Sequence, residues 1–139
     1  MQRQSDLHPV HASSIEDILI TAELERRPRR APDHAAENRA MAALARQMAG
    51  DPGGVPQKLA ELLVDLCGAD SAGISLLDHE DGREVFRWTA VAGASAPELG
   101  GTIARDASPC GAVVDRNQLI LLKDAGRFYP ALRGYETRA

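Results

Sequence analysis

Apolar residues recur at helical spacing near the start of the chain. Between residues 13 and 22 the positions Ile15, Ile18, Leu19 and Ala22 follow the i, i+3, i+4, i+7 pattern of a short amphipathic helix. Ser13 with Glu16 three residues later is typical of a capping box at a helix start. The pattern therefore predicts a short helix with one apolar face, beginning at Ser13.

Two longer helices are predicted next. Asp33 can cap a helix over residues 33–49, and Gly68 fits the end of another over residues 56–67. The sequence between them, DPGG at 51–54, is a helix breaker. The residues expected to pack are Ala40, Ala43, Leu44, Gln47 and Met48 in the first of these helices, and Leu59, Leu62, Leu63, Leu66 and Cys67 in the second.

The pattern then changes to the period of two that marks β-strands. Residues 71–78 and 84–92 alternate in this way, and the turn-forming residues 79–82 separate them. The two runs predict an antiparallel hairpin, with Phe86, Trp88 and Ala90 on one face of its second strand.

Shorter elements are predicted in the last third. Residues 102–105 are an extended candidate, and Ser108 followed by Pro109 is typical of a helix start, here over residues 109–115. Residues 118–122 are apolar on both sides, as in a buried strand. Helices, a hairpin, a short helix and a strand in this order predict an α+β fold.

Composition narrows the class of protein without naming an activity. The chain has 139 residues and a net charge of -4, with 44% hydrophobic residues, which is ordinary for a globular domain. An acidic balance argues against a nucleic-acid binder, and no apolar run is long enough for a membrane helix. Without a signal-peptide pattern, we expect a cytoplasmic protein with no membrane partner.

Four stretches taken together resemble the GAF domain, as found at the front of bacterial sensor histidine kinases. They are AENRAMAALARQMA, LAELLVDLCGADSAGISLLD, GREVFRWTAVAGASAPELGGT and RDASPCGAVVDRNQLILL. The series ADSAGISLL, EVFRW and SPCG carries most of the likeness, which covers roughly residues 21–132.

The resemblance implies a PAS/GAF-type antiparallel sheet with helices on one side and a small-molecule pocket on the other. It also implies sensing, linked to a histidine kinase or response regulator pathway. GAF domains end with two more strands and a long helix, and those strands sit beside the strand that residues 71–78 resemble. We therefore expect a C-terminally truncated, marginally stable domain over residues 33–139, preceded by a flexible segment over residues 1–32 with its short helix.

Cys110 is the sharpest candidate for chemistry. Ser108 and Pro109 place it in the first turn of a helix, where N–H groups and the helix dipole favour a thiolate, and Arg105 adds positive charge nearby. One interpretation is a redox-sensing or ligand-attaching thiol, and the other is a small packed residue. Cys67, on the leucine face of its helix, is expected to pack in the core.

Phe86 and Trp88 are the other candidate pocket residues. As pocket walls they would stack on a flat ligand, and as core residues under the helices they would need none. The four histidines show no metal-ligand spacing with cysteine or acidic residues, so we predict no metal site. The sequence contains no recognisable catalytic triad, phosphate loop or pair of carboxylates, so we name no catalytic residue.

Three functional hypotheses follow. The first is a non-enzymatic sensory module of bacterial two-component signal transduction, which binds a small ligand or reads redox state. The second is a ligand-free dimerisation or interaction module, in which the helices of residues 34–67 form a homodimer surface. The third is a thiol-dependent enzyme resembling free methionine sulfoxide reductases, which the lack of a later cysteine argues against. The GAF resemblance does not fix a ligand or cofactor, because this scaffold accepts many.

Overall fold

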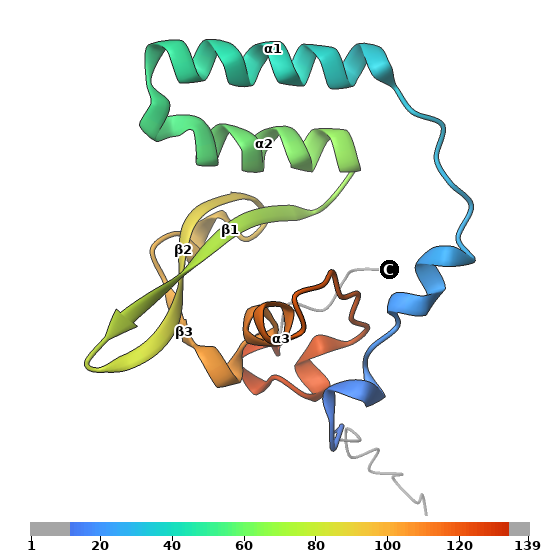
Figure 1. Cartoon of the computed structure of the whole chain (residues 1–139), viewed down its shortest axis with the longest axis vertical. Coiled ribbons are helices and arrows are strands. Elements are labelled where there is room, and N and C mark those ends of the chain that lie inside the picture. Colours follow the sequence, from blue (N-terminus) through green and yellow to red (C-terminus); the bar gives the residue numbers. More distant parts are fainter. Residues whose placement is uncertain (1–11, 134–139) are drawn as a thin grey trace, which may run out of the picture. The chain divides into compact units, whose positions relative to one another are not determined.

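The structure is a computed structural model that describes residues 12–133 (Figure 1). These residues form two compact units, one of residues 29–105 and one that combines residues 12–28 with 106–133. Within the described part there are three α-helices and one three-stranded antiparallel sheet, so the predicted α+β class is confirmed. Residues 1–11 of the predicted flexible segment and 134–139 of the predicted partial domain lie outside the described residues.

Two of the helices form as their sequence signals predict. Helix α1 spans His34–Gly50, and the Asp33 carboxylate accepts a hydrogen bond from the Ala36 N–H at 2.9 Å. Helix α2 spans Val55–Cys67 and ends at Gly68, which adopts the left-handed conformation with φ of 60°. Both caps lie at the predicted positions, so the local sequence determines where α1 begins and where α2 ends.

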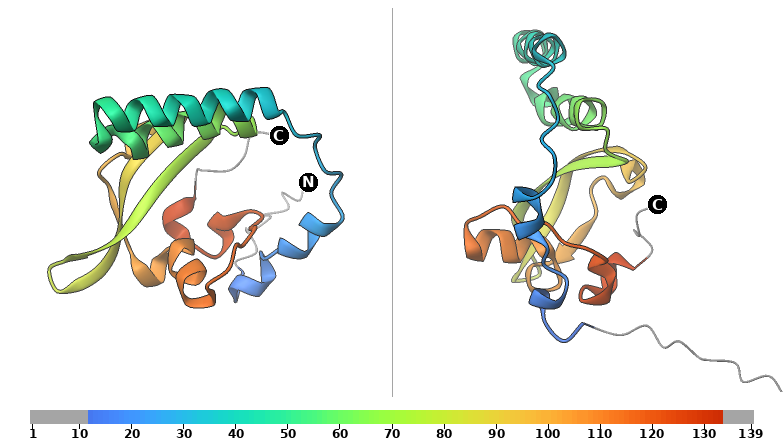
Figure 2. Two further views of the ribbon diagram at one scale, coloured as in Figure 1. Left: turned by 45° about the horizontal axis from the view of Figure 1, so that its top comes forward. Right: turned by 90° about the vertical axis from the view of Figure 1, so that its right-hand side faces the viewer.

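The first unit has three layers, in which α2 lies between α1 and the sheet (Figures 1 and 2). Its core is small: Ala60 of α2 packs against Ala90 and Ala92 of the sheet, with Val64 and Ile74 around them. Alanine at the centre lets the helix approach the sheet closely, but it buries little apolar area. The core of this unit is therefore thin.

The sheet consists of β1 (Ser71–Glu80), β2 (Arg83–Gly93) and β3 (Thr102–Ala104), in the order β1-β2-β3. The hairpin turn is shorter than the predicted 79–82, because only Asp81 and Gly82 lie outside the strands. Both have positive φ, 51° and 76°, as a two-residue turn between twisted strands requires. Among the described residues, no strand pairs with the outer edge of β1.

A β-bulge corrects the predicted face of β2. Ile74 pairs with Ala90 while Ser75 pairs with Trp88, so Thr89 is an extra residue and the alternation shifts there. Ala90 consequently faces α2, whereas Trp88 lies on the opposite face with Phe86. The prediction that Phe86, Trp88 and Ala90 share a face was wrong for Ala90, and the two aromatic residues do not lie under α2.

The helical stripes are also corrected in part. Met48 was expected to pack, but it is 61% exposed, because the inner face of α1 is formed by Ala36, Ala40, Ala43, Leu44 and Gln47. Cys67 was expected in the core, but it is exposed at the end of α2. Two faces of α2 are used: one meets the sheet through Ala60 and Val64, and the leucine face lies toward α1.

In the second unit, the predicted short helix is replaced by two 3-10 turns, Ile15–Asp17 and Thr21–Glu25. The capping box belongs to Ser14 and Asp17, one residue later than predicted. The Ser14 hydroxyl accepts from the Glu16 N–H at 3.1 Å, and the Asp17 carboxylate accepts from the Ser14 N–H at 3.0 Å. These turns hold Ile18, which is 1% exposed.

Helix α3 spans Pro109–Arg116 and begins at Ser108 as predicted. The predicted strand over 118–122 is wrong: only Leu122 forms a bridge, with Leu19, and Leu119 is 67% exposed. The apolar run instead pairs its backbone with the segment near the start of the chain, because the Ile20 N–H donates to the Leu121 carbonyl at 2.8 Å. The segments on either side of residues 29–105 are thereby joined within this unit.

Candidate functional site

The aromatic face of the sheet is the face of β1 and β2 opposite α2, and it carries Phe86 and Trp88. The Trp88 ring lies over Gly73 of β1, so close that a Cβ on Gly73 would stand 3.1 Å from a ring carbon. Phe86 is 3% exposed, while Trp88 is half-buried and its neighbour Leu77 is 43% exposed. Glycine at position 73 thus allows a large aromatic ring to lie close against the strand, and Gly73 and Leu77 on this face of β1 are exposed.

The predicted site residues divide between the two units. Phe86, Trp88 and Arg105 belong to the sheet unit, and Ser108 and Cys110 belong to the second unit. The structure brings together Phe86 with Trp88 on one face, and Ser108 with Cys110 at one helix start. Arg105, expected to act on Cys110, pairs its Nε with the Glu84 carboxylate at 3.5 Å.

The start of α3 has the predicted geometry. Ser108 is 3% exposed, and its hydroxyl accepts a hydrogen bond from the Cys110 N–H at 3.1 Å. Cys110 is half-buried and Gly111 beside it is buried. In the same unit, burial raises the pKa of Tyr129, which is 4% exposed. This geometry fits both interpretations of Cys110, the reactive thiol and the packed residue.

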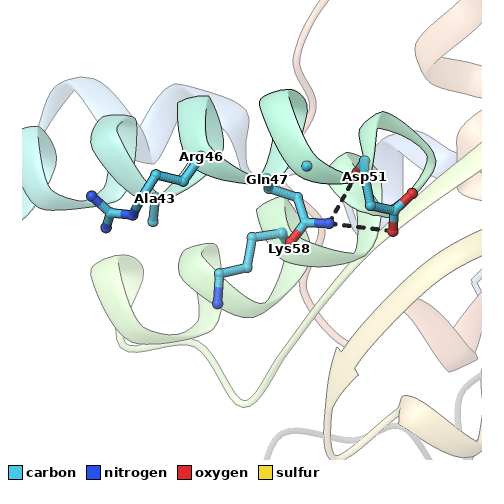
Figure 3. A pocket seen from close by; sticks show the side chains of 6 residues that line it. Ala43, Arg46, Gln47, Asp51 and Lys58 are labelled. Carbon is cyan, nitrogen blue, oxygen red and sulfur yellow. Dashed lines mark hydrogen bonds between the residues drawn. The ribbon is translucent and has the colours of Figure 1, made fainter.

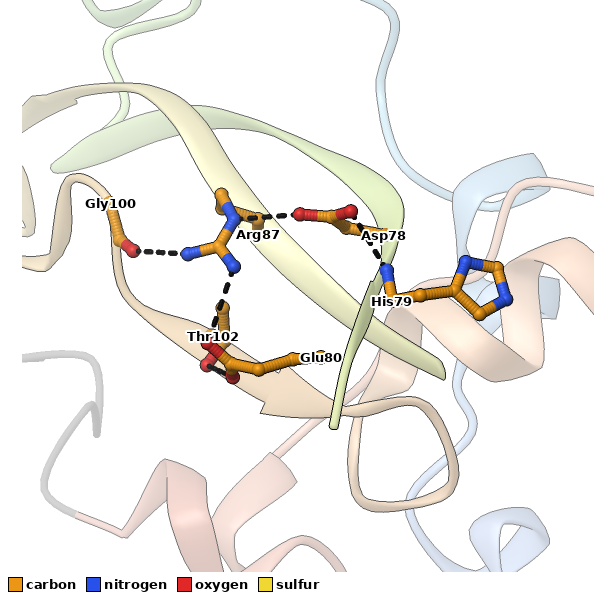
Figure 4. A network of polar contacts seen from close by, with 6 residues as sticks. All are labelled: Asp78, His79, Glu80, Arg87, Gly100 and Thr102. Atoms are coloured by element: carbon orange, nitrogen blue, oxygen red, sulfur yellow. Dashed lines mark hydrogen bonds and ion pairs between the residues drawn. The ribbon is translucent and has the colours of Figure 1, made fainter. Parts of the chain in front are cut away.

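A polar network that the sequence analysis missed lies at the hairpin end of the sheet (Figure 4). The Arg87 Nε donates to Asp78 at 2.8 Å, and its two terminal nitrogens reach Gly100 and Glu80 at 3.2 and 3.4 Å. Thr102 also donates to Glu80, at 3.1 Å. The guanidinium therefore ties β2 to β1 and to the loop before β3, and Glu80 extends the network to β3 through Thr102.

The network shifts the ionisation of its members. The hydrogen bond from Arg87 holds the pKa of Asp78 below its usual value, and the hydrogen bond to Asp78 raises the pKa of Arg87. Each charged group of the pair is already satisfied by the other. We therefore assign the network a structural role. The sequence does place Asp78 and Arg87 on two neighbouring strands. Their contact could be predicted only if the register of those strands were already known.

Two hollows lie along the helices of the sheet unit. One, of about 460 Å³, lies between the end of α1 and the start of α2, near Arg46 and Lys58 (Figure 3). There Gln47 donates to the Asp51 carbonyl at 3.0 Å, which ties the end of α1 to the following turn. The other, of about 770 Å³, lies between the start of α1 and the end of α2.

Residues 12–133 contain no group of three or more histidine, cysteine or acidic side chains placed to hold a metal ion. No helix within the same range is both long and apolar enough to cross a membrane. Comparisons with protein-family models, with curated proteins and with solved structures find no match to this chain.

Proposed function

We propose that this chain is a sensory module of the GAF type, which binds a small flat ligand on the aromatic face and regulates a histidine kinase of a bacterial two-component system. The position of Trp88 carries the proposal. Its ring lies over Gly73 on the face opposite α2, which is the side of the sheet where the GAF resemblance implies a ligand pocket.

The open part of this face suits a planar molecule. Trp88 is half-buried, and Gly73 and Leu77 beside it are exposed on β1. A half-buried aromatic ring packed against a strand offers stacking to a second flat ring, which contributes about 0.5–1.5 kcal/mol beyond the buried area. The ligand class is therefore a heteroaromatic small molecule, and purine cyclic nucleotides are suitable probes.

Trp88 is the only tryptophan in the chain, so its fluorescence reports directly on the proposed site. We expect cyclic GMP or cyclic AMP to change Trp88 emission in a saturable manner. Calorimetry should show that Trp88→Leu loses binding and that Trp88→Phe keeps most of it. Met48→Leu, an exposed substitution on α1, is the matched control. If neither nucleotide binds, or if Trp88→Leu binds as well as the wild type, ligand sensing on this face is wrong.

The kinase link has its own test, which is whether the operon that encodes this chain also encodes a histidine kinase core. We expect it to do so. An operon without a kinase core would contradict the link to a kinase, without bearing on ligand binding at Trp88.

A ligand-free interaction module is the second candidate, and one observation favours it. In α1 only Ala40 is buried, while Met41 is 66% and Met48 is 61% exposed. Exposed methionines on one helix are typical of interaction surfaces. Sedimentation of the nucleotide-free chain separates the two candidates. A dimer that Met41→Gln with Met48→Gln converts to a monomer would support this second function.

A further inference from the structure

The groove between the start of α1 and the end of α2, which we call the helix groove, is a second candidate binding site. Its floor is apolar, and it exists because α1 contributes only small side chains there. Ala36 and Ala40 lie opposite three half-buried leucines of α2, so the leucines remain partly uncovered. Those leucines are Leu62, Leu63 and Leu66. The groove has a volume of about 770 Å³, within the usual range for small-molecule sites.

The rim of the helix groove carries two arginines without an ion-pair partner among residues 12–133. Arg30 approaches from the segment before α1, with a terminal nitrogen 4.0 Å from where a Cβ on Gly68 would stand. Arg39 approaches from α1. Both side chains are exposed, so their charge is available to a bound molecule.

The acidic residues on the same rim are mostly engaged. Asp33 accepts the hydrogen bond of the α1 cap, and Glu37 lies 3.1 Å from His34. Asp65 is the third acidic residue of the rim. The rim thus holds three carboxylates and two guanidinium groups, and Arg30 and Arg39 are its groups able to bind the negatively charged head of a molecule whose apolar body lies on the floor.

We propose that the helix groove binds a medium-chain fatty carboxylate. The leucines of α2 would contact the chain, and Arg30 and Arg39 would bind the carboxylate. The stretch that lines the groove at the start of α1, from the cap residue Asp33 to Ala40, rises about 10 Å along the helix axis, and an extended decanoate is of similar length. This site is separate from the aromatic face, which lies on the other side of the sheet from α2.

Decanoate, kept below its micelle-forming concentration, is the probe. We expect saturable binding by calorimetry, with leucine methyl NMR shifts confined to Leu62, Leu63 and Leu66. Replacing both Arg30 and Arg39 by glutamine should weaken binding at least tenfold. Arg46→Gln is the matched control, because Arg46 is an exposed arginine of α1 outside the helix groove, and it should leave binding unchanged. The neutral 1-decanol should bind at least tenfold more weakly than decanoate.

Other outcomes would overturn the proposal. They are the absence of saturable binding, an equal loss in the Arg46→Gln control, or equal binding of 1-decanol. Binding to phosphatidylglycerol vesicles that depends on Arg30 and Arg39, without binding of free decanoate, would assign the groove to a lipid surface and contradict a free carboxylate. Trp88 emission separates this test from the proposed function, since decanoate should leave it unchanged. Loss of either site would leave the other intact.

Discussion

Gln57 completes the hydrogen bonding of β2 beyond the stretch that pairs with β3. Strand β3 pairs only with Val85–Arg87. The two glycines just before β3, Gly100 and Gly101, exchange backbone hydrogen bonds with Trp88. At Val91 the Gln57 amide takes the place of β3: it donates to the Val91 carbonyl at 2.9 Å and accepts from the Val91 N–H at 3.1 Å. A single side chain thus makes the two hydrogen bonds that a residue of a neighbouring strand would make.

Replacing Gln57 by leucine should therefore lower the free energy of unfolding by about 1–3 kcal/mol. The N–H and carbonyl of Val91 would both lose their partner, and water cannot replace it easily because Val91 is only 4% exposed. Urea unfolding followed by Trp88 fluorescence measures the loss. Gln47→Leu is the control, since its hydrogen bonds to Asp51 are exposed and water replaces them. Equal losses of unfolding free energy in the two variants would show that the buried hydrogen bonds to Val91 stabilise the fold no more than the exposed ones to Asp51.

Asp78 and Arg87 make a pH-dependent contribution at the residue scale. Because the folded pKa of Asp78 is depressed, the stabilisation is present above the unfolded value, about 4, and is lost as the pH falls through the folded pKa. In the Arg87→Gln variant, carboxyl NMR should show the Asp78 midpoint moving up toward that of a free aspartate. The difference in urea midpoint between wild type and variant should shrink on acidification to pH 3. A midpoint for Asp78 that is unchanged in the variant would contradict this account.

For single elements, two glycine substitutions distinguish the effect of backbone conformation on stability from the effect of packing. Gly82 in the hairpin turn has φ of 76°, and Gly50 closes α1 without positive φ. Neither has an atom within 4 Å of an added Cβ. Gly82→Ala should therefore cost about 1 kcal/mol through left-handed strain, whereas Gly50→Ala should gain about 0.5 kcal/mol through helix propensity. Urea unfolding of both variants checks the opposite signs, and the same sign for both would contradict the backbone explanation.

Elements with local signals were predictable, and their pairing was not. Asp33 and Gly68 mark helix ends by their own hydrogen bonds and dihedral angles, so sequence alone places α1 and α2. The bulge at Thr89 depends on the register of two strands. The Thr89 hydroxyl donates to the Ile74 carbonyl at 3.2 Å, a contact with no sequence signature. Because the sequence does not predict this bulge, the sequence analysis assigned Ala90 to the wrong face of β2.

The candidate sites show the same limit. The start of α3 at Ser108 and Cys110 follows from a local cap, and the sequence places it correctly. The helix groove and the Arg87 network combine residues from separate elements, and only packing brings them together. The apolar run over 118–122 was misassigned because apolarity on both sides does not separate a strand from a packed loop.

At the scale of the whole molecule, a thin core coincides with an open sheet edge. Among the described residues, the largest side chain buried below 2% is Ile18, and the sheet unit centres on alanines. Strand β1 has ten residues and a described strand partner on one edge only, and its Leu76 is 57% exposed. Small cores stabilise weakly, and uncovered strand edges pair with other chains. Both features favour self-association of the native or partly unfolded chain.

We therefore expect the weight-average sedimentation coefficient of the chain to rise with concentration, and Leu76→Lys to suppress that rise by placing a charge on the edge strand. Leu119→Lys is the matched control, because Leu119 is 67% exposed outside any strand. Suppression by Met41→Gln with Met48→Gln instead would assign the association to α1. A wild-type chain that stays monomeric would contradict association through the open strand edge. One sharp cooperative melting transition would contradict the marginal stability expected from the thin core.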